Sequence, residues 1–167
     1  EAARRIMSRG RIEFDVLASR EKGSGHVYRC LQIADELAHH TIRFRPGRME
    51  PWARQLVGTR GWITALEAYS PDVVVLDCLD TTTEQVCANQ ASGVKVVCLE
   101  DLGSGSDHAD LVVNELYRDA RPNVVSGPRW AVLRPEFLCA PPFEVSDIRR
   151  VLVLFGGTDA AQVSGRV

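Results

Sequence analysis

The residues best suited to chemistry form a short turn that ends in a histidine, Gly23-Ser24-Gly25-His26. The turn follows an apolar run and opens a helical pattern, and its two glycines permit close backbone approach by a ligand. Unpaired N–H groups and partial positive charge at a helix start suit a phosphate. That charge disfavours an imidazolium, and a neutral His26 can act as a general base. The alternative is a histidine that only caps or packs at the helix start.

Other polar residues stand where apolar runs end: Asp77, Glu100-Asp101, Asn114 and the run Gly156-Gly157-Thr158-Asp159. Ligands of open α/β sheets bind outside the carboxyl ends of the strands, so these residues are candidate ligand contacts. Turn chemistry alone would also explain polar strand ends. Arg29, one helical turn beyond His26, either reaches back toward an anion or pairs with a carboxylate on its own helix.

Several familiar sites are absent from the sequence. A G-x-G-x-x-G dinucleotide motif would need glycine where Tyr28 stands, and G-x-x-x-x-G-K-[ST] does not occur. The five cysteines include no C-x-x-C pair, which favours neither a zinc site nor a disulfide framework. We therefore expect no metal and no cofactor.

The segments that must position these residues are predicted to alternate between helices and strands. Val27, Cys30, Leu31, Ala34 and Leu37 follow the i, i+3, i+4, i+7 spacing of an amphipathic helix that begins near Ser24-Gly25. A second helix is expected over 82–90. Apolar runs predict strands over 12–18, 41–44, 71–77, 94–99, 109–114 and 151–155. Continuous valine-rich runs are typical of parallel strands covered on both faces. The pattern predicts an α/β, Rossmann-like, doubly wound and mostly parallel sheet.

The same pattern suggests a division of the chain. Residues 1–10 are interpreted as a tag, a linker or the end of a preceding segment, and 11–142 as a Rossmann-like domain. Prolines and charges over 143–150 indicate a linker. The strand at 151–155 and its glycine turn would begin a second domain over 151–167.

Composition narrows the class of protein. With 45% hydrophobic residues, 25% charged residues and a net charge of -2, the chain is neither a disordered segment nor a strongly basic nucleic-acid binder. No apolar run approaches the roughly 20 residues that span a bilayer. We expect a soluble, cytoplasmic protein with no nucleic-acid partner.

The ordered set of motifs resembles one family, the nucleotide-sugar hydrolases of pseudaminic acid synthesis, together with the related spore coat polysaccharide biosynthesis proteins. The hydrolases release UDP from a 2,4-diacetamido-2,4,6-trideoxyhexose. The matching segments extend over about residues 12–160 and lie at 23–31, 74–77, 99–102, 108–114, 127–137 and 155–159.

The resemblance implies the N-terminal half of a two-domain GT-B architecture, similar to the glycosyltransferase that makes lipid II. His26 would be the catalytic base that activates water against the anomeric carbon, without a metal ion. Gly25 and the helix start would face the UDP-sugar, and Gly156 to Asp159 would approach its diphosphate from the second domain. Residues 1–167 alone should then fold but be inactive. A fusion or complex with other sugar-pathway enzymes is a further expectation.

The chain departs from the family where the hydrolases commonly show Asp-His-Tyr, because it reads Asp77-Cys78-Leu79. Two alternatives therefore stay open. One is a glycosyltransferase in which a sugar or lipid hydroxyl replaces water, and the other is a non-catalytic sugar-nucleotide-binding or assembly domain. Apart from His26, the substrate-binding candidates are Gly23, Ser24, Gly25, Arg29, Asp77, Asn114, Gly156, Gly157, Thr158 and Asp159.

Overall fold

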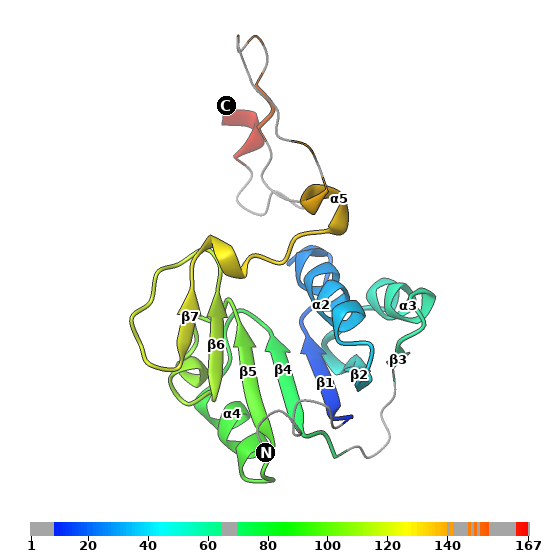
Figure 1. The fold of residues 1–167 in the computed structure, drawn as a ribbon, viewed down its shortest axis with the longest axis vertical. Helices are drawn as coiled ribbons and strands as arrows, with labels where there is room; N and C mark the ends of the chain where they lie inside the picture. Colours follow the sequence, from blue (N-terminus) through cyan, green and yellow to red (C-terminus); the bar gives the residue numbers. More distant parts are fainter. Residues whose placement is uncertain are drawn as a thin grey trace.

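The chain folds around a seven-stranded, all-parallel sheet (Figure 1). The structure is a computed structural model, and it describes residues 9–64, 70–139, 141, 147, 149, 151–153 and 163–166. The strand order is β3-β2-β1-β4-β5-β6-β7. The strands are β1 (Arg11–Val16), β2 (Thr41–Arg45), β3 (Ile63–Thr64), β4 (Val73–Asp77), β5 (Lys95–Leu99), β6 (Leu111–Asn114) and β7 (Val124–Ser126).

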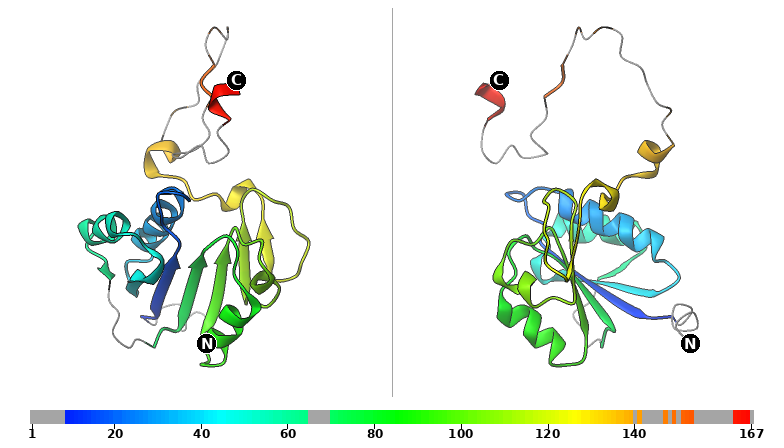
Figure 2. Two further views of the ribbon diagram at one scale, coloured as in Figure 1. Left: turned by 180° about the vertical axis from the view of Figure 1, so that it is seen from behind. Right: turned by 60° about the vertical axis from the view of Figure 1, so that its left-hand side comes forward.

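Helices cover both faces of this sheet. The described α-helices are α2 (Gly25–Glu36), α3 (Pro51–Thr59), α4 (Thr83–Gln90) and the short α5 (Pro135–Leu138). Single 3-10 turns lie at η1 (Pro46–Arg48), η2 (Ser104–Asp107), η3 (Pro128–Trp130) and η4 (Ser164–Arg166). Figure 2 shows α2 and α4 on opposite sides of the sheet. No helix in the described part of the chain is long and apolar enough to cross a membrane.

Two apolar clusters hold the layers together, one on each face. On the α2 face, Phe14 and Val16 of β1 pack with Val27 and Leu31 of α2, and all four are buried. On the α4 face, the cluster consists of Val74, Leu76, Val86, Val96, Cys98, Ala109 and Val112. Side chains of one strand alternate between the faces, so adjacent valines serve different clusters. The continuous apolar runs of the sequence therefore cover a sheet from both sides.

The strand order reverses between β1 and β4. From β1 the chain proceeds outward to β2 and β3, then returns to place β4 against the other side of β1. Val16 at the end of β1 lies opposite Asp77 at the end of β4. Such a reversal is the usual ligand-binding crevice of an open α/β sheet. The turn after β1 and the last residue of β4 thus meet at one place.

The predicted fold class is confirmed, including the long helix and the valine-rich strands. Sequence reasoning missed α3, β3 and β7. β7 has only three residues, lies within a proline-rich stretch and depends on pairing with β6.

The predicted strand at 151–155 is not found at residues 151–153, which are exposed and unpaired. A strand needs hydrogen-bonded neighbours, and no described strand pairs with these residues. Residues 154–155 lie outside the described part, as do most of 1–10 and 143–150. The domain boundaries stay predictions.

Candidate active site

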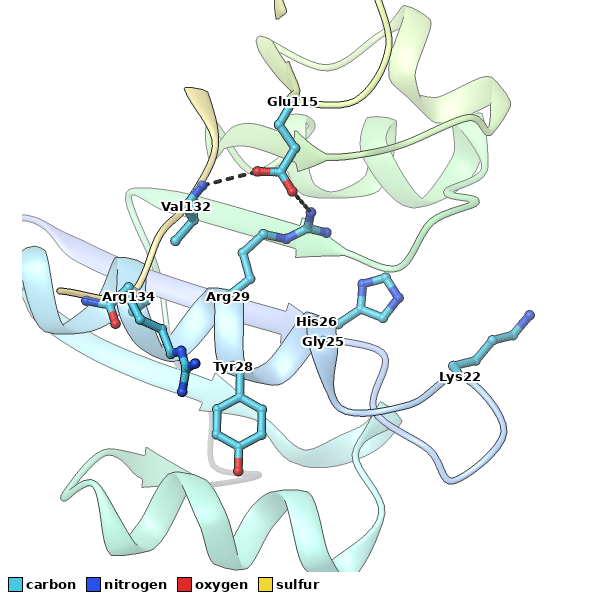
Figure 3. A pocket seen from close by; sticks show the side chains of 9 residues that line it. Lys22, Gly25, His26, Tyr28, Arg29, Glu115, Val132 and Arg134 are labelled. Atoms are coloured by element: carbon cyan, nitrogen blue, oxygen red, sulfur yellow. Dashed lines mark hydrogen bonds and ion pairs between the residues drawn. The ribbon is translucent and has the colours of Figure 1, made fainter. Parts of the chain in front are cut away.

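A pocket of about 350 Å³ opens at the reversal between β1 and β4 (Figure 3). The start of α2 forms one wall, and the chain that follows β6 and η3 forms the other. Most of the residues that line it have a polar group in the side chain, and the lining consists of Lys22, Gly25, His26, Tyr28, Arg29, Gln32, Glu115, Val132 and Arg134. Lys22, Arg29 and Arg134 outnumber the carboxylates of Glu115 and of the buried Asp77, which pairs with Arg29, so a small excess of positive charge remains. The pocket therefore suits an anionic ligand.

His26 is held by Asp77. Its Nδ1 atom lies 2.6 Å from Oδ1 of Asp77, whose side chain is fully buried. Burial would raise the pKa of the Asp77 carboxyl, but hydrogen bonds from His26 and Arg29 bring this pKa below its ordinary value. A carboxylate can only accept hydrogen bonds, so Nδ1 of His26 carries the proton. In the neutral form of the ring the lone pair is then on Nε2, which has no hydrogen-bond partner among the described residues.

Arg29 completes the support of Asp77. Its Nε and Nη2 atoms donate to the two carboxylate oxygens at 2.9 and 2.7 Å. Burial would lower the pKa of Arg29, but the hydrogen bond to Asp77 raises it. The Nη1 atom of Arg29 lies 3.6 Å from Glu115, whose other oxygen accepts from the backbone N–H of Val132 at 3.1 Å. Arg29 thus links β4 to the loop after β6, as Figure 3 shows in part.

The glycine turn has the local geometry that its composition predicts. Gly23 has a positive φ of 83°, a conformation that favours glycine. Ser24 is the N-cap of α2, but its side chain makes no capping hydrogen bond. The first N–H groups of the helix are therefore left for other acceptors. A Cβ on Gly25 would have no protein atom within 4 Å, so the chain itself does not require glycine there.

Two buried polar side chains lie deeper at the same edge of the sheet. Asn114 ends β6 with 2% exposure, and its Oδ1 atom has no hydrogen-bond partner. Glu100 follows β5 with a φ of 51°, which is unusual for a residue other than glycine. Its Oε1 atom accepts from the backbone N–H of Glu115, but its Oε2 atom is buried without a partner. Buried unpaired oxygens are rare in proteins and require an explanation.

The structure brings part of the predicted set together. Gly25, His26 and Arg29 line the pocket, and Gly23 and Ser24 form the adjoining turn. Asp77 and Asn114 stand at the correct edge, but both are buried and neither lines the pocket. The predicted residues Gly156 to Asp159 lie outside the described part of the chain.

Sequence reasoning missed Lys22, Glu115 and Arg134. Glu115 directly follows the predicted strand end at Asn114, so its place could have been inferred. Arg134 comes from an irregular stretch that carries no such signal.

The arrangement can perform proton transfer. A buried carboxylate orients an imidazole that lines an anion-accepting pocket, which is the arrangement of a positioned general base. In the described residues no three His, Cys, Asp or Glu side chains converge as a group that could hold a metal. The expectation of a site without metal or cofactor stays a prediction.

Fold and site together define an α/β, Rossmann-like domain with a histidine–carboxylate pair at the reversal point of its sheet. No family model matches the chain, and no curated protein matches it significantly in sequence. One similar solved structure is spinosyn forosaminyltransferase SpnP, at 12% identity and a TM-score of 0.48 over 71% of this chain and 50% of that one.

Another is a phosphoglycerate oxidoreductase from Rhizobium etli, at 12% identity and a TM-score of 0.41 over 76% of this chain and 46% of that one. The chain thus spans about half the length of each of these proteins.

Proposed function

We propose that this chain is the catalytic-base domain of a nucleotide-sugar hydrolase that releases UDP from an amino-deoxyhexose of the diacetamido-trideoxy type. The observation that carries the proposal is the hydrogen bond between His26 and the buried Asp77, because it leaves Nε2 as the proton-accepting atom of a histidine that lines an anion-accepting pocket. The resemblance of the motif order to pseudaminic acid pathway hydrolases supports the choice of substrate.

The proposed reaction is a displacement at the anomeric carbon. Nε2 of His26 removes a proton from water, the water oxygen bonds to the anomeric carbon, and the bond to the diphosphate oxygen breaks. UDP leaves with the electron pair. Asp77 would stabilise the imidazolium that forms, acting as a positioning residue rather than as the substrate contact that its place at a strand end suggested. A positioned base of this kind contributes about 10²- to 10⁴-fold to the rate.

The cations of the pocket have a separate role in this proposal. Lys22, Arg29 and Arg134 would stabilise the negative charge that develops on the leaving diphosphate, together with the first N–H groups of α2. A second domain that begins after residue 150 would complete the site with Gly156, Gly157, Thr158 and Asp159. In this reading the protein has a GT-B architecture and acts in the cytoplasm on the UDP-sugar.

The test combines two variants, measured in a form of the protein that carries the second domain. His26→Asn should lower UDP release by about 10²- to 10⁴-fold and leave substrate affinity nearly unchanged. Gly25→Ala should leave stability unchanged, because the added methyl meets no protein atom, but it should weaken substrate binding by intruding on the ligand. Gly58→Ala in α3 is the matched control, since its methyl also meets no protein atom and lies outside the pocket.

Two results would contradict the proposal. Unchanged turnover in His26→Asn would remove the proposed base. Binding of UDP-sugars without any turnover would instead favour a non-catalytic sugar-nucleotide-binding domain.

A glycosyltransferase is the second candidate, and one feature favours it. A largely apolar groove adjoins the pocket and shares Arg29, Glu115 and Val132 with it. An acceptor hydroxyl could then replace water as the nucleophile, with the same loss of its proton to His26. UDP release that depends on an added alcohol acceptor, with little release in water alone, would distinguish this candidate from hydrolysis.

A further inference from the structure

The groove beside the pocket is an uncovered part of the sheet. On the α4 face, Val96 of β5 and Val112 of β6 are fully buried. On the α2 face, their neighbours Val97 and Val113 are only partly buried and form the floor of the groove. In the described part of the chain no helix covers these two valines. The exposed floor is therefore a surface that can take an apolar ligand.

The groove has walls as well as a floor. Ile33 and Leu37 of α2 form one side, and Trp130 and Val132 form the other. The groove extends as far as Ile12 and Val73, near the amino ends of β1 and β4, and its volume is about 240 Å³. Nearly all of its accessible lining is apolar. An apolar space that extends along the strands from Ile12 and Val73 to Glu100 and Glu115 fits an extended hydrocarbon chain.

The upper end of the groove is continuous with the pocket. Arg29 and Glu115 line both spaces, and Glu100 lines the groove. Glu100 is only 5% exposed, and its Oε2 atom has no hydrogen-bond partner. A buried carboxylate oxygen in this position requires a donor. A ligand hydroxyl at the head of the chain would supply that donor.

We propose that this groove binds the hydrocarbon chain of an amphiphilic alcohol whose polar head lies at Glu100 and the His26 pocket. The proposal rests on the proposed function for the role of the pocket, but it concerns binding and not turnover. A group of methylene size occupies roughly the volume of a water, about 30 Å³, so the groove holds about eight carbons. One turn of α-helix, about 10 Å wide and 5.4 Å long, needs roughly 400 Å³. The groove therefore suits a thin chain better than a helix of a protein partner.

A chain-length series tests this assignment. Calorimetry of the 167-residue chain with n-alkyl β-D-glucosides, from butyl to decyl and below their critical micelle concentrations, should show affinity rising about fourfold per added methylene. The rise should stop near eight carbons, where the groove is full. Glu100→Gln should weaken binding of every member by about tenfold and leave the slope unchanged, because it removes the charged acceptor of the head group.

Matched variants separate the groove from general hydrophobic binding. Val97→Phe fills the floor and should move the plateau to a shorter chain. Ile63→Phe adds the same ring at an exposed position outside the groove and should leave the series unchanged. Affinity that is independent of chain length, or a plateau that Val97→Phe does not move, would overturn the assignment.

The outcomes also distinguish the two proposals. His26→Asn should leave the fourfold rise per methylene unchanged, because that rise depends on the groove and His26 does not line the groove. Affinity that rises with chain length as expected, without UDP-sugar turnover in the two-domain form, would reject the catalytic proposal alone. Affinity that does not rise with chain length, together with turnover that depends on His26, would reject the groove proposal alone.

Discussion

Replacing Asp77 with asparagine is the most informative perturbation of this site. The substitution keeps the shape of the side chain but removes a buried negative charge that accepts two hydrogen bonds from Arg29 and one from His26. The side chain of Arg29 is only 16% exposed, so in the variant its guanidinium would depend on Glu115 at 3.6 Å. The substitution should lower the stability of the domain and should change which ring nitrogen of His26 carries the proton.

The size of the stability effect follows from burial. Removing one partner of a buried ion pair costs about 3–5 kcal/mol, and the remaining contact with Glu115 places Asp77→Asn near the lower end, at about 3 kcal/mol. For a chain of this length that loss lowers Tm by about 6–12 °C. The pKa of Asp77 is lowered in the folded protein, so its contribution is complete above about pH 4 and fades as pH falls through the folded value. The difference between variant and wild type should therefore shrink at acidic pH.

Two measurements on the 167-residue chain test this reasoning. Urea unfolding between pH 3 and 7 gives the free-energy difference, and ¹⁵N NMR of the imidazole identifies the protonated nitrogen. Wild type should carry the proton on Nδ1 of His26, whereas an asparagine amide at position 77 can donate to Nδ1 and shift the proton to Nε2. Asp72→Asn, which alters an exposed ion pair with Arg11, is the control and should change the curve much less than Asp77→Asn. A wild-type proton on Nε2, or a loss below about 1 kcal/mol for Asp77→Asn, would refute the reasoning.

Three further predictions concern the scaffold. Gly103→Ala should cost about 2–3 kcal/mol in urea unfolding, because its Cβ would lie 2.2 Å from a backbone oxygen, whereas Gly47→Ala meets no atom and should be neutral. Burial opposes ionisation of Asp110, but hydrogen bonds from a lysine, a backbone N–H and a glutamine lower its pKa to about 2. Asp110→Asn should therefore lower the free energy of unfolding by about 1 kcal/mol at pH 7, a value discounted for the exposure of the side chain. The difference from wild type should vanish as pH falls toward 2, and a difference that is constant with pH would contradict this. Of five thiols, only the exposed Cys87 and Cys139 should react rapidly with a thiol reagent in the native protein, and rapid reaction of a third would contradict the buried positions of the others.

Local sequence signals were sufficient for much of the fold. The spacing of Val27, Cys30 and Leu31 predicts the buried face of α2, and the structure confirms it. β7 could not be predicted in the same way, since a three-residue strand has too few side chains for a period and depends on pairing with β6. The predicted strand at 151–155 shows the reverse case, because residues 151–153 have strand-like composition but no described neighbour with which to pair.

The candidate site divides in a similar manner. The sequence by itself determined that a glycine turn, a histidine and a helix start would stand together, because these features are local and their order along the chain is sufficient. Only the tertiary structure decided what His26 contacts, since Asp77 lies 51 residues away and reaches it through the pairing of β1 with β4. The sequence predicts Asp77 as a ligand contact. Because the packed layers bury it, Asp77 is instead an internal partner of His26 and Arg29. The apolar groove is likewise a tertiary property, because only packing decides which valine in each adjacent pair stays uncovered.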